Sequence, residues 1–138
     1  MKKALAILLC AVVLLSVCGC GADSAASDID VDLTSLSSTM VYAEVNNMLT
    51  DPDAYLGKTV KMHGSFAVYE GEARNYYACI ISDATACCSQ GIEFVLDGAY
   101  AYPADYPELG SEVTVTGIFD TYSEDGRLYC QLINAAME

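Results

Sequence analysis

Two adjacent cysteines, Cys87 and Cys88, stand in the segment DATACCSQGIEF, and the chain has one histidine, His63. Thiolate and imidazole groups are the ligands that Zn(II) and Cu(I) prefer in proteins. If the strand around His63 pairs with the next strand about a turn centred near Glu72, His63 falls opposite Ser82, beside the loop that holds both cysteines. We therefore predict a soft-metal site that contains Cys87, Cys88 and His63.

Further residues near this loop could complete a tetrahedral site. Asp83 and Glu93 offer carboxylate oxygens, and Cys79 is a more distant thiol.

Two other states of the thiols stay open. With Cys130, residues 39–138 hold four cysteines, an even number that could form disulfides in an exported protein, or the thiols could be inert. Cys130 falls on the apolar face of its predicted strand, which favours a buried free thiol there.

Catalysis is not favoured by these residue types. A cysteine nucleophile needs an adjacent general base, and His63 is the only histidine that could serve as one. The sequence also has no Gly-x-Ser-x-Gly motif and no phosphate-binding loop. We therefore expect that the protein is not an enzyme.

The first twenty residues, MKKALAILLCAVVLLSVCGC, have the pattern of a bacterial lipoprotein signal. Lys2 and Lys3 precede an apolar run over residues 4–17, which as a helix would span about 21 Å, less than the roughly 30 Å hydrocarbon core of a bilayer. The run ends in a lipobox-like VCGC. We expect a signal peptide over residues 1–19 and a lipid on Cys20, which would anchor the protein to the extracytoplasmic face of the cell membrane. An ordinary secretory signal is the alternative.

Residues 20–38 are rich in serine, alanine and aspartate and contain no aromatic residue, so we expect a disordered acidic tether. The folded domain is then expected over residues 39–138, enough chain for one small core. Loss of Lys2 and Lys3 with the signal would leave four basic against nineteen acidic residues, a formal net charge of −15. Such a chain repels phosphate backbones, which excludes nucleic acid as a partner.

The hydrophobic pattern of the domain predicts one helix followed by strands. Apolar residues recur at helical spacing over residues 40–49, and Asp51-Pro52 ends that pattern. Alternation and turn residues predict five strands: residues 59–69 with a bend at Gly64, 76–82, 92–96, 113–119 and 128–133. Five short strands without room for crossover helices predict a small Greek-key barrel of the OB type, with one N-terminal helix. A five-stranded meander closed by the helix is the alternative.

Three segments, YLGKTVKMHGSF, DATACCSQGIEF and LGSEVTVTGIFD, resemble a group of bacterial OB-like lipoproteins of unassigned function. The resemblance covers residues 40–135 and implies the same OB-like fold. The cysteine segment alone also resembles extracytoplasmic subunits of permeases, some of which are linked to zinc homeostasis. That weaker likeness implies a transporter or another envelope protein as a partner.

These patterns together predict a membrane-anchored, extracytoplasmic binding or accessory module that binds zinc and serves a transport system. A structural or protein-interaction lipoprotein is the alternative, with no ligand and with disulfide-bonded or inert cysteines. The tyrosine-rich loop GAYAYPADYPELG could contact a partner, but we expect it to pack over the open end of the barrel.

Overall fold

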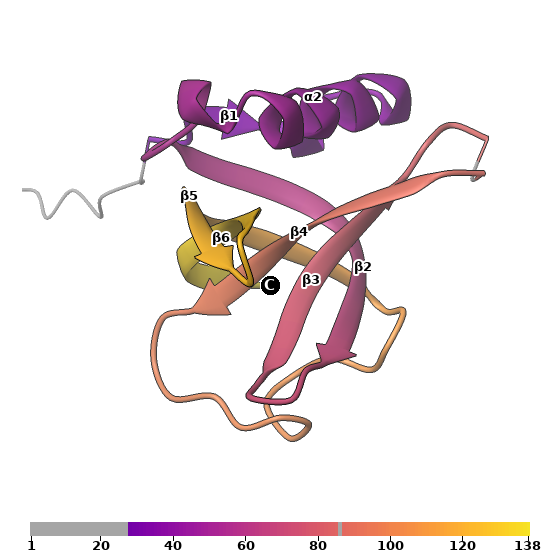
Figure 1. Ribbon diagram of the computed structural model, residues 1–138. Coiled ribbons are helices and arrows are strands. Elements are labelled where there is room, and N and C mark those ends of the chain that lie inside the picture. The colour runs from indigo at the N-terminus through magenta and orange to yellow at the C-terminus, as the bar shows by residue number, and fades with distance from the viewer. Residues whose placement is uncertain (1–27, 86) are drawn as a thin grey trace, which may run out of the picture.

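The computed structural model of the protein describes residues 28–85 and 87–138 (Figure 1). The predicted signal peptide, Cys20 and the first part of the predicted tether lie outside the described residues. The described elements are β1 (Val31–Asp32), η1 (Leu33–Ser35), α2 (Ser38–Thr50), η2 (Pro52–Ala54), β2 (Thr59–Glu70), β3 (Asn75–Ser82), β4 (Ser89–Leu96), β5 (Glu112–Glu124) and β6 (Arg127–Met137).

The described part of the chain is mainly β, with six strands in one sheet and one α-helix, as the sequence predicts in outline. The strand order is β1-β2-β3-β4-β6-β5, and β2 also pairs with β5. The predicted alternative, a meander, is wrong because β4 lies next to β6 and parallel to it, whereas a meander would place β5 beside β4.

The long strand β2 pairs with two neighbouring strands along its length. Its first part, from Thr59 to Ser65, pairs with β5, and its second part, from Ser65 to Glu70, pairs with β3. The change of partner falls at the predicted bend. A Cβ atom at Gly64 would lie 2.3 Å from the carbonyl oxygen of Ile80, so only glycine permits this close approach of β2 to β3.

The core is apolar and lies between the strands and α2. Its three phenylalanines, Phe66, Phe94 and Phe119, come from three different strands and are fully buried. From α2, Val45 and Met48 are buried against the same core, as the helical spacing predicts. The helix lies across one end of the sheet (Figure 1) and packs on β3 and β4. Among the described helices, none is both long enough and apolar enough to span a bilayer.

Part of the segment that is expected to form the tether packs on the sheet. Residues 31–32 form β1, which pairs in parallel with Val60 and Lys61 of β2. Leu33 follows, and its side chain is only 1% exposed. The physical reason is that Val31 and Leu33 are apolar enough to be buried, although the residues around them have the composition of a tether.

The tyrosine-rich loop between β4 and β5 packs on the core, as expected. The Tyr106 ring stacks on Tyr77 with ring centroids 4.2 Å apart, and it also lies 5.7 Å from the Phe66 ring. Tyr102 packs against Tyr77 at 5.8 Å. These contacts close the end of the core that lies opposite α2 (Figure 1).

Candidate metal centre

The two adjacent cysteines lie at the tip of the β3–β4 hairpin, which projects from the sheet at the upper right of Figure 1. Ladder pairing ends at Ser82 and Ser89, and the Asp83 N–H then donates to the Cys88 carbonyl at 2.9 Å. The Asp83 carboxylate in turn accepts the backbone N–H of Cys87 at 2.9 Å. An aspartate that accepts from nearby backbone N–H groups stabilises a tight turn, so Asp83 determines where both thiols lie.

Asp83, Cys87 and Cys88 bring one carboxylate and two thiols together. Their potential ligand atoms all lie within 4.8 Å of one another, and the two cysteines are exposed. The Sγ atoms of Cys87 and Cys88 are 3.6 Å apart, and Cys87 Sγ donates to Asp83 Oδ2 at 3.1 Å. In a tetrahedral site with zinc–sulfur bonds of about 2.3 Å, two sulfurs are about 3.8 Å apart, so the two thiols are already spaced for one ion.

The pKa shifts within this cluster determine which of its potential ligands carry a proton at neutral pH. The hydrogen bond with Cys87 raises the pKa of Cys88, and burial and the Asp83 charge act in the same direction. The hydrogen bond from Cys87, with further bonds from Thr85, lowers the pKa of Asp83. At neutral pH the carboxylate is therefore ionised and the Cys88 thiol is protonated, so a cation must displace that proton.

Thr85 also belongs to this cluster, although it is not among the ligands predicted from the sequence. Its hydroxyl donates to the Asp83 carboxylate at 3.1 Å, and its oxygen also lies 3.2 Å from Cys87 Sγ. The spacing Asp-x-Thr is a known turn signal, because both side chains can bond to local backbone groups, and it could have identified Thr85. Thr85 orients two of the three potential ligands, as outer-shell residues do in metal sites.

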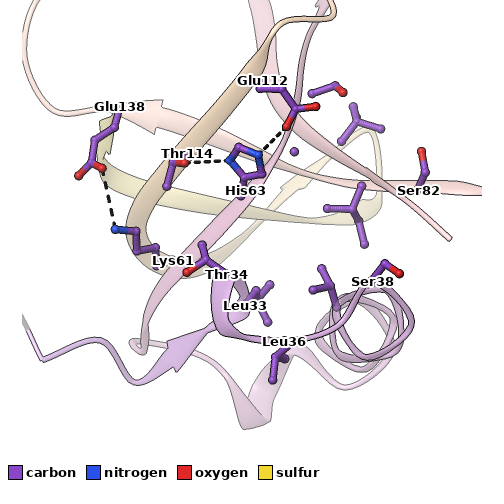
Figure 2. A pocket seen from close by; sticks show the side chains of 15 residues that line it. Leu33, Thr34, Leu36, Ser38, Lys61, His63, Ser82, Glu112, Thr114 and Glu138 are labelled. Carbon is purple, nitrogen blue, oxygen red and sulfur yellow. Dashed lines mark hydrogen bonds and ion pairs between the residues drawn. The ribbon is translucent and has the colours of Figure 1, made fainter. Parts of the chain in front are cut away.

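His63 does not join the two cysteines. The predicted register of the β2–β3 hairpin is right, since Ser65 pairs with Ile80, but that pairing ends there and His63 lies opposite Thr114 of β5. The predicted position opposite Ser82 is therefore wrong, because β2 changes its partner beside Gly64. Nδ1 of His63 is 2.9 Å from Thr114 Oγ1, and Nε2 contacts the Glu112 carboxylate (Figure 2).

His63 lines a cavity of about 610 Å³ between the sheet and the segment that contains η1 and α2 (Figure 2). Ser82 lines the same cavity, so the two residues face one space without pairing. The side chains of His63 and Glu112 are 48% and 72% exposed. Water competes with contacts this exposed, so they contribute little to stability.

Two other predicted ligands are engaged elsewhere. The Glu93 carboxylate accepts from Arg74 Nη1 at 2.6 Å and also from the Tyr122 hydroxyl. Cys79 lies opposite Ile92 in the ladder and is fully buried, and burial raises the pKa of its thiol to about 12. Neither side chain belongs to the cluster that the described residues form.

None of the four cysteines of the folded part forms a disulfide, which was one of the predicted states. Cys79, Cys87, Cys88 and Cys130 are all free. Cys130 is half-buried, with its sulfur 4.0 Å from the Met48 carbonyl oxygen, and burial raises its pKa. Cys130 is therefore free, as expected, but it is only partly buried, whereas a buried thiol was expected.

Comparison with known proteins adds no assignment. A scan against protein-family models finds no family that matches the chain. A search of curated proteins finds no similar protein. The geometry of the described residues is therefore the basis for a function.

Proposed function

We propose that the protein is a lipid-anchored, extracytoplasmic binding module that holds a soft metal ion, Zn(II), at the tip of its β3–β4 hairpin. The observation that carries this proposal is the 3.6 Å separation of the Cys87 and Cys88 sulfurs, next to the Asp83 carboxylate. Three ligands from one chain leave a fourth position of a tetrahedral ion for water or for a group from a partner. An exposed ion with one exchangeable position suits delivery to or from a transporter or another envelope protein.

We also propose that the sheet is a barrel of the OB type. Support comes from the pairing of β2 with both β3 and β5, and from β6, which links β4 to β5. This arrangement agrees with the resemblance to OB-like lipoproteins. The acidic charge argues against the oligonucleotides that many OB folds bind, and fold alone assigns no ligand.

A lipoprotein that binds no metal and acts only in structure or protein interaction is the second candidate. The Asp83 carboxylate already accepts bonds from Thr85 and from Cys87, so the turn is complete without an ion. In this alternative the two thiols are inert or oxidised, and Asp83 serves only to shape the turn. Neither candidate includes catalysis.

The test is a Zn(II) titration of the full-length chain in nonionic detergent and under reducing conditions. We expect one equivalent to bind, and Cys87→Ser/Cys88→Ser to abolish binding, because both sulfurs are ligands. Thr85→Val should weaken binding by about 10-fold to 100-fold, as loss of an outer-shell partner does. Cys130→Ser is the matched control, since it removes a free thiol outside the cluster, and it should bind like the parent.

The titration also separates this cluster from the predicted one that included His63. His63→Ala should leave Zn(II) affinity unchanged, because His63 contacts Glu112 and Thr114 instead. Affinity should rise with pH between about 6 and 8, by about tenfold per pH unit for each thiol proton displaced. If the parent and the double serine variant bind Zn(II) equally well, the proposed site at Cys87 and Cys88 is refuted. The second candidate function, without a metal at this cluster, would then stand.

A further inference from the structure

A second cavity, of about 560 Å³, opens between two hairpins on the outer face of the sheet. One wall is the β2–β3 hairpin, where Tyr69 and Tyr76 are directly opposite one another. The other wall is the β5–β6 hairpin, where Tyr122 and Tyr129 are opposite one another and stack at 5.4 Å. The volume lies in the range of about 300–1,000 Å³ that small-molecule sites occupy. We call this space the tyrosine cleft.

The floor of the tyrosine cleft is made of small side chains. Ala78 and Gly91 line it from β3 and β4, beside Ile80. A Cβ atom at Gly91 would lie 2.4 Å from Cδ1 of Ile80, so a larger residue there would push that side chain into the space. The hollow therefore depends on specific small residues and not only on the curvature of the strands.

Exposed apolar side chains gather around this cleft. The described residues include ten large apolar side chains that are exposed, and four of them line this one cleft: Leu49, Tyr69, Leu128 and Tyr129. Single exposed apolar residues are common on protein surfaces, but a group around a cavity marks a binding site.

The charged groups that line the tyrosine cleft are both carboxylates, Glu93 and Glu124, and no lysine or arginine is among its described lining residues. Glu93 is neutralised from outside the cleft by Arg74 Nη1 at 2.6 Å. The Arg74 guanidinium also lies over the rings of Tyr76 and Tyr122, 4.1 and 5.3 Å from their centroids. One cation, the Arg74 guanidinium, is therefore already bound at these walls by two ring faces and a carboxylate.

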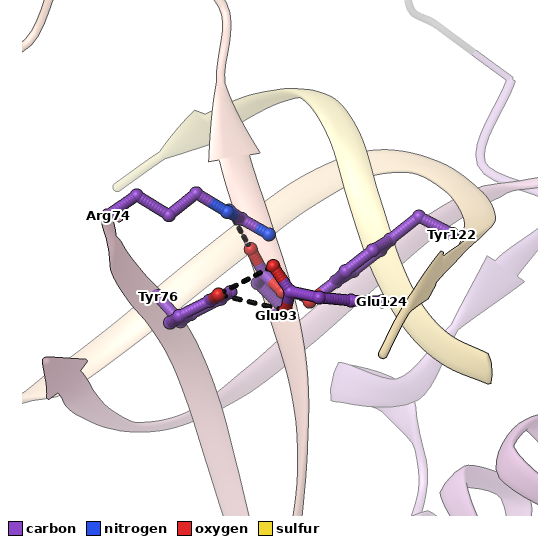
Figure 3. A network of polar contacts seen from close by, with 5 residues as sticks. All are labelled: Arg74, Tyr76, Glu93, Tyr122 and Glu124. Carbon is purple, nitrogen blue, oxygen red and sulfur yellow. Dashed lines mark hydrogen bonds and ion pairs between the residues drawn. The ribbon is translucent and has the colours of Figure 1, made fainter. Parts of the chain in front are cut away.

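Glu124 forms no ion pair among the described residues, although Arg127 lies opposite it in the β5–β6 ladder. Its two oxygens accept from the Tyr76 hydroxyl at 2.8 Å, which links the two hairpins (Figure 3). Arg74, Glu93 and Tyr122 form a second link between the hairpins in the same view. The walls are thus held in place before a ligand arrives, and the Glu124 carboxylate lines the cleft without an ion pair from the described residues.

We propose that the tyrosine cleft binds a small organic cation, such as a quaternary ammonium compound, between the tyrosine faces and next to Glu124. Ring faces attract cations through their quadrupole, and the carboxylate adds a full charge. The formal net charge of −13 raises the local concentration of any cationic solute and disfavours an anionic one. This site shares no residue with the Cys87–Cys88 cluster and does not depend on metal binding.

The probe is choline, and its control is 3,3-dimethyl-1-butanol, which has the same shape without the charge. Both are titrated by calorimetry into the full-length chain in nonionic detergent with a metal chelator present, so that the metal site is silent. We expect saturable binding of choline, and binding of the neutral compound that is weaker by about tenfold or more.

Three variants assign that binding to the tyrosine cleft. Glu124→Gln keeps an acceptor for the Tyr76 hydroxyl but removes the charge, and it should weaken choline binding by about fivefold. Tyr69→Leu replaces a ring that is 59% exposed, so it should fold normally and weaken binding by about threefold. Glu108→Gln removes the same charge from an exposed position outside the cleft, and it should change affinity less than about twofold.

The proposal is overturned if choline does not bind, or if the neutral compound binds as tightly as choline does. It is also overturned if Glu124→Gln and Tyr69→Leu both bind choline like the parent. Selective binding of a neutral oligosaccharide in place of choline would assign the cleft to a different ligand class and equally refute the proposal.

Discussion

Leu33→Ala tests where the folded part of the chain begins. The residue lies in a segment whose composition predicts a tether, yet its side chain is 1% exposed and packs with the core. It is held there by β1 and by the residue before it, since the Asp30 N–H donates to the Thr59 carbonyl at 2.9 Å. The Thr59 N–H returns a bond to Asp30 Oδ2 at 2.8 Å. If this packing is right, truncation at Leu33 should cost as much as truncation of any core leucine.

The expected cost follows from full burial. Fully buried leucines lose about 2.7–5.0 kcal/mol of unfolding free energy on truncation to alanine, and we expect about 3 kcal/mol at Leu33. For a folded part of about this size, each kcal/mol lowers Tm by about 4–8 °C, so the variant should melt about 12–24 °C lower. The cost includes the cavity left beside η1, which contacts both α2 and β2.

Urea unfolding at equilibrium, followed by far-UV circular dichroism, measures the difference. Leu56→Ala is the matched control because the same atoms are removed from a side chain that is 45% exposed, and it should cost less than about 0.5 kcal/mol. The slope of free energy against urea should stay the same in both variants. A cost at Leu33 no larger than that at Leu56 would refute the packing and restore the tether up to residue 38.

Two further predictions address other cysteines. Burial raises the pKa of the Cys79 thiol from 9.0 to about 12, so the unfolded chain loses this proton first. The stability that Cys79 contributes is therefore complete below about pH 9, and it falls by about 1.4 kcal/mol per pH unit as the pH rises toward 12. Cys79→Ala should unfold with a flatter pH dependence above pH 9 than the parent, and parallel curves would contradict this reasoning. If Cys20 carries the lipid, labelled palmitate should enter the parent chain in bacterial cells but not Cys20→Ala, and label retained by the variant would refute that anchor.

The strands could be predicted because their residues alternate. In β2, Val60, Met62 and Phe66 are buried while their neighbours in sequence are less buried, and the same pattern marks β5. The turn that is predicted near Glu72 would also place Ser65 opposite Ile80, and this pair is observed. Strand β1 has two residues and so no period that a sequence pattern can reveal.

The position of His63 could not be predicted from a hairpin register alone. Register states which residues would be opposite if two strands stay paired, but it does not state where a long strand leaves its partner. The bend at Gly64 was visible in the sequence, whereas the partner of the strand before the bend was not. The partner of that part of β2 is residues 112–118 of β5, which are far away in the chain. This pairing can be predicted only when the topology of the whole sheet is known.

The role of Glu93 was hidden for a related reason. Its two partners, Arg74 and Tyr122, are 19 and 29 residues away in sequence. Local patterns can identify Asp83, whose partners Thr85 and Cys87 are two and four residues away. Contacts within one turn are therefore readable from the sequence, and contacts between hairpins are not.

The β3–β4 hairpin lets the fold and the two proposed sites be tested separately. Along β3, Cys79 and Ile81 are buried in the core, whereas Tyr76 and Ile80 line the tyrosine cleft on the opposite face. The two exposed cysteines lie beyond the last ladder pair and bury little apolar surface. Serine substitutions at the tip should therefore change the free energy of unfolding by less than about 0.5 kcal/mol. A loss of zinc binding in such a variant then reports on the ligands themselves and not on the core that carries them.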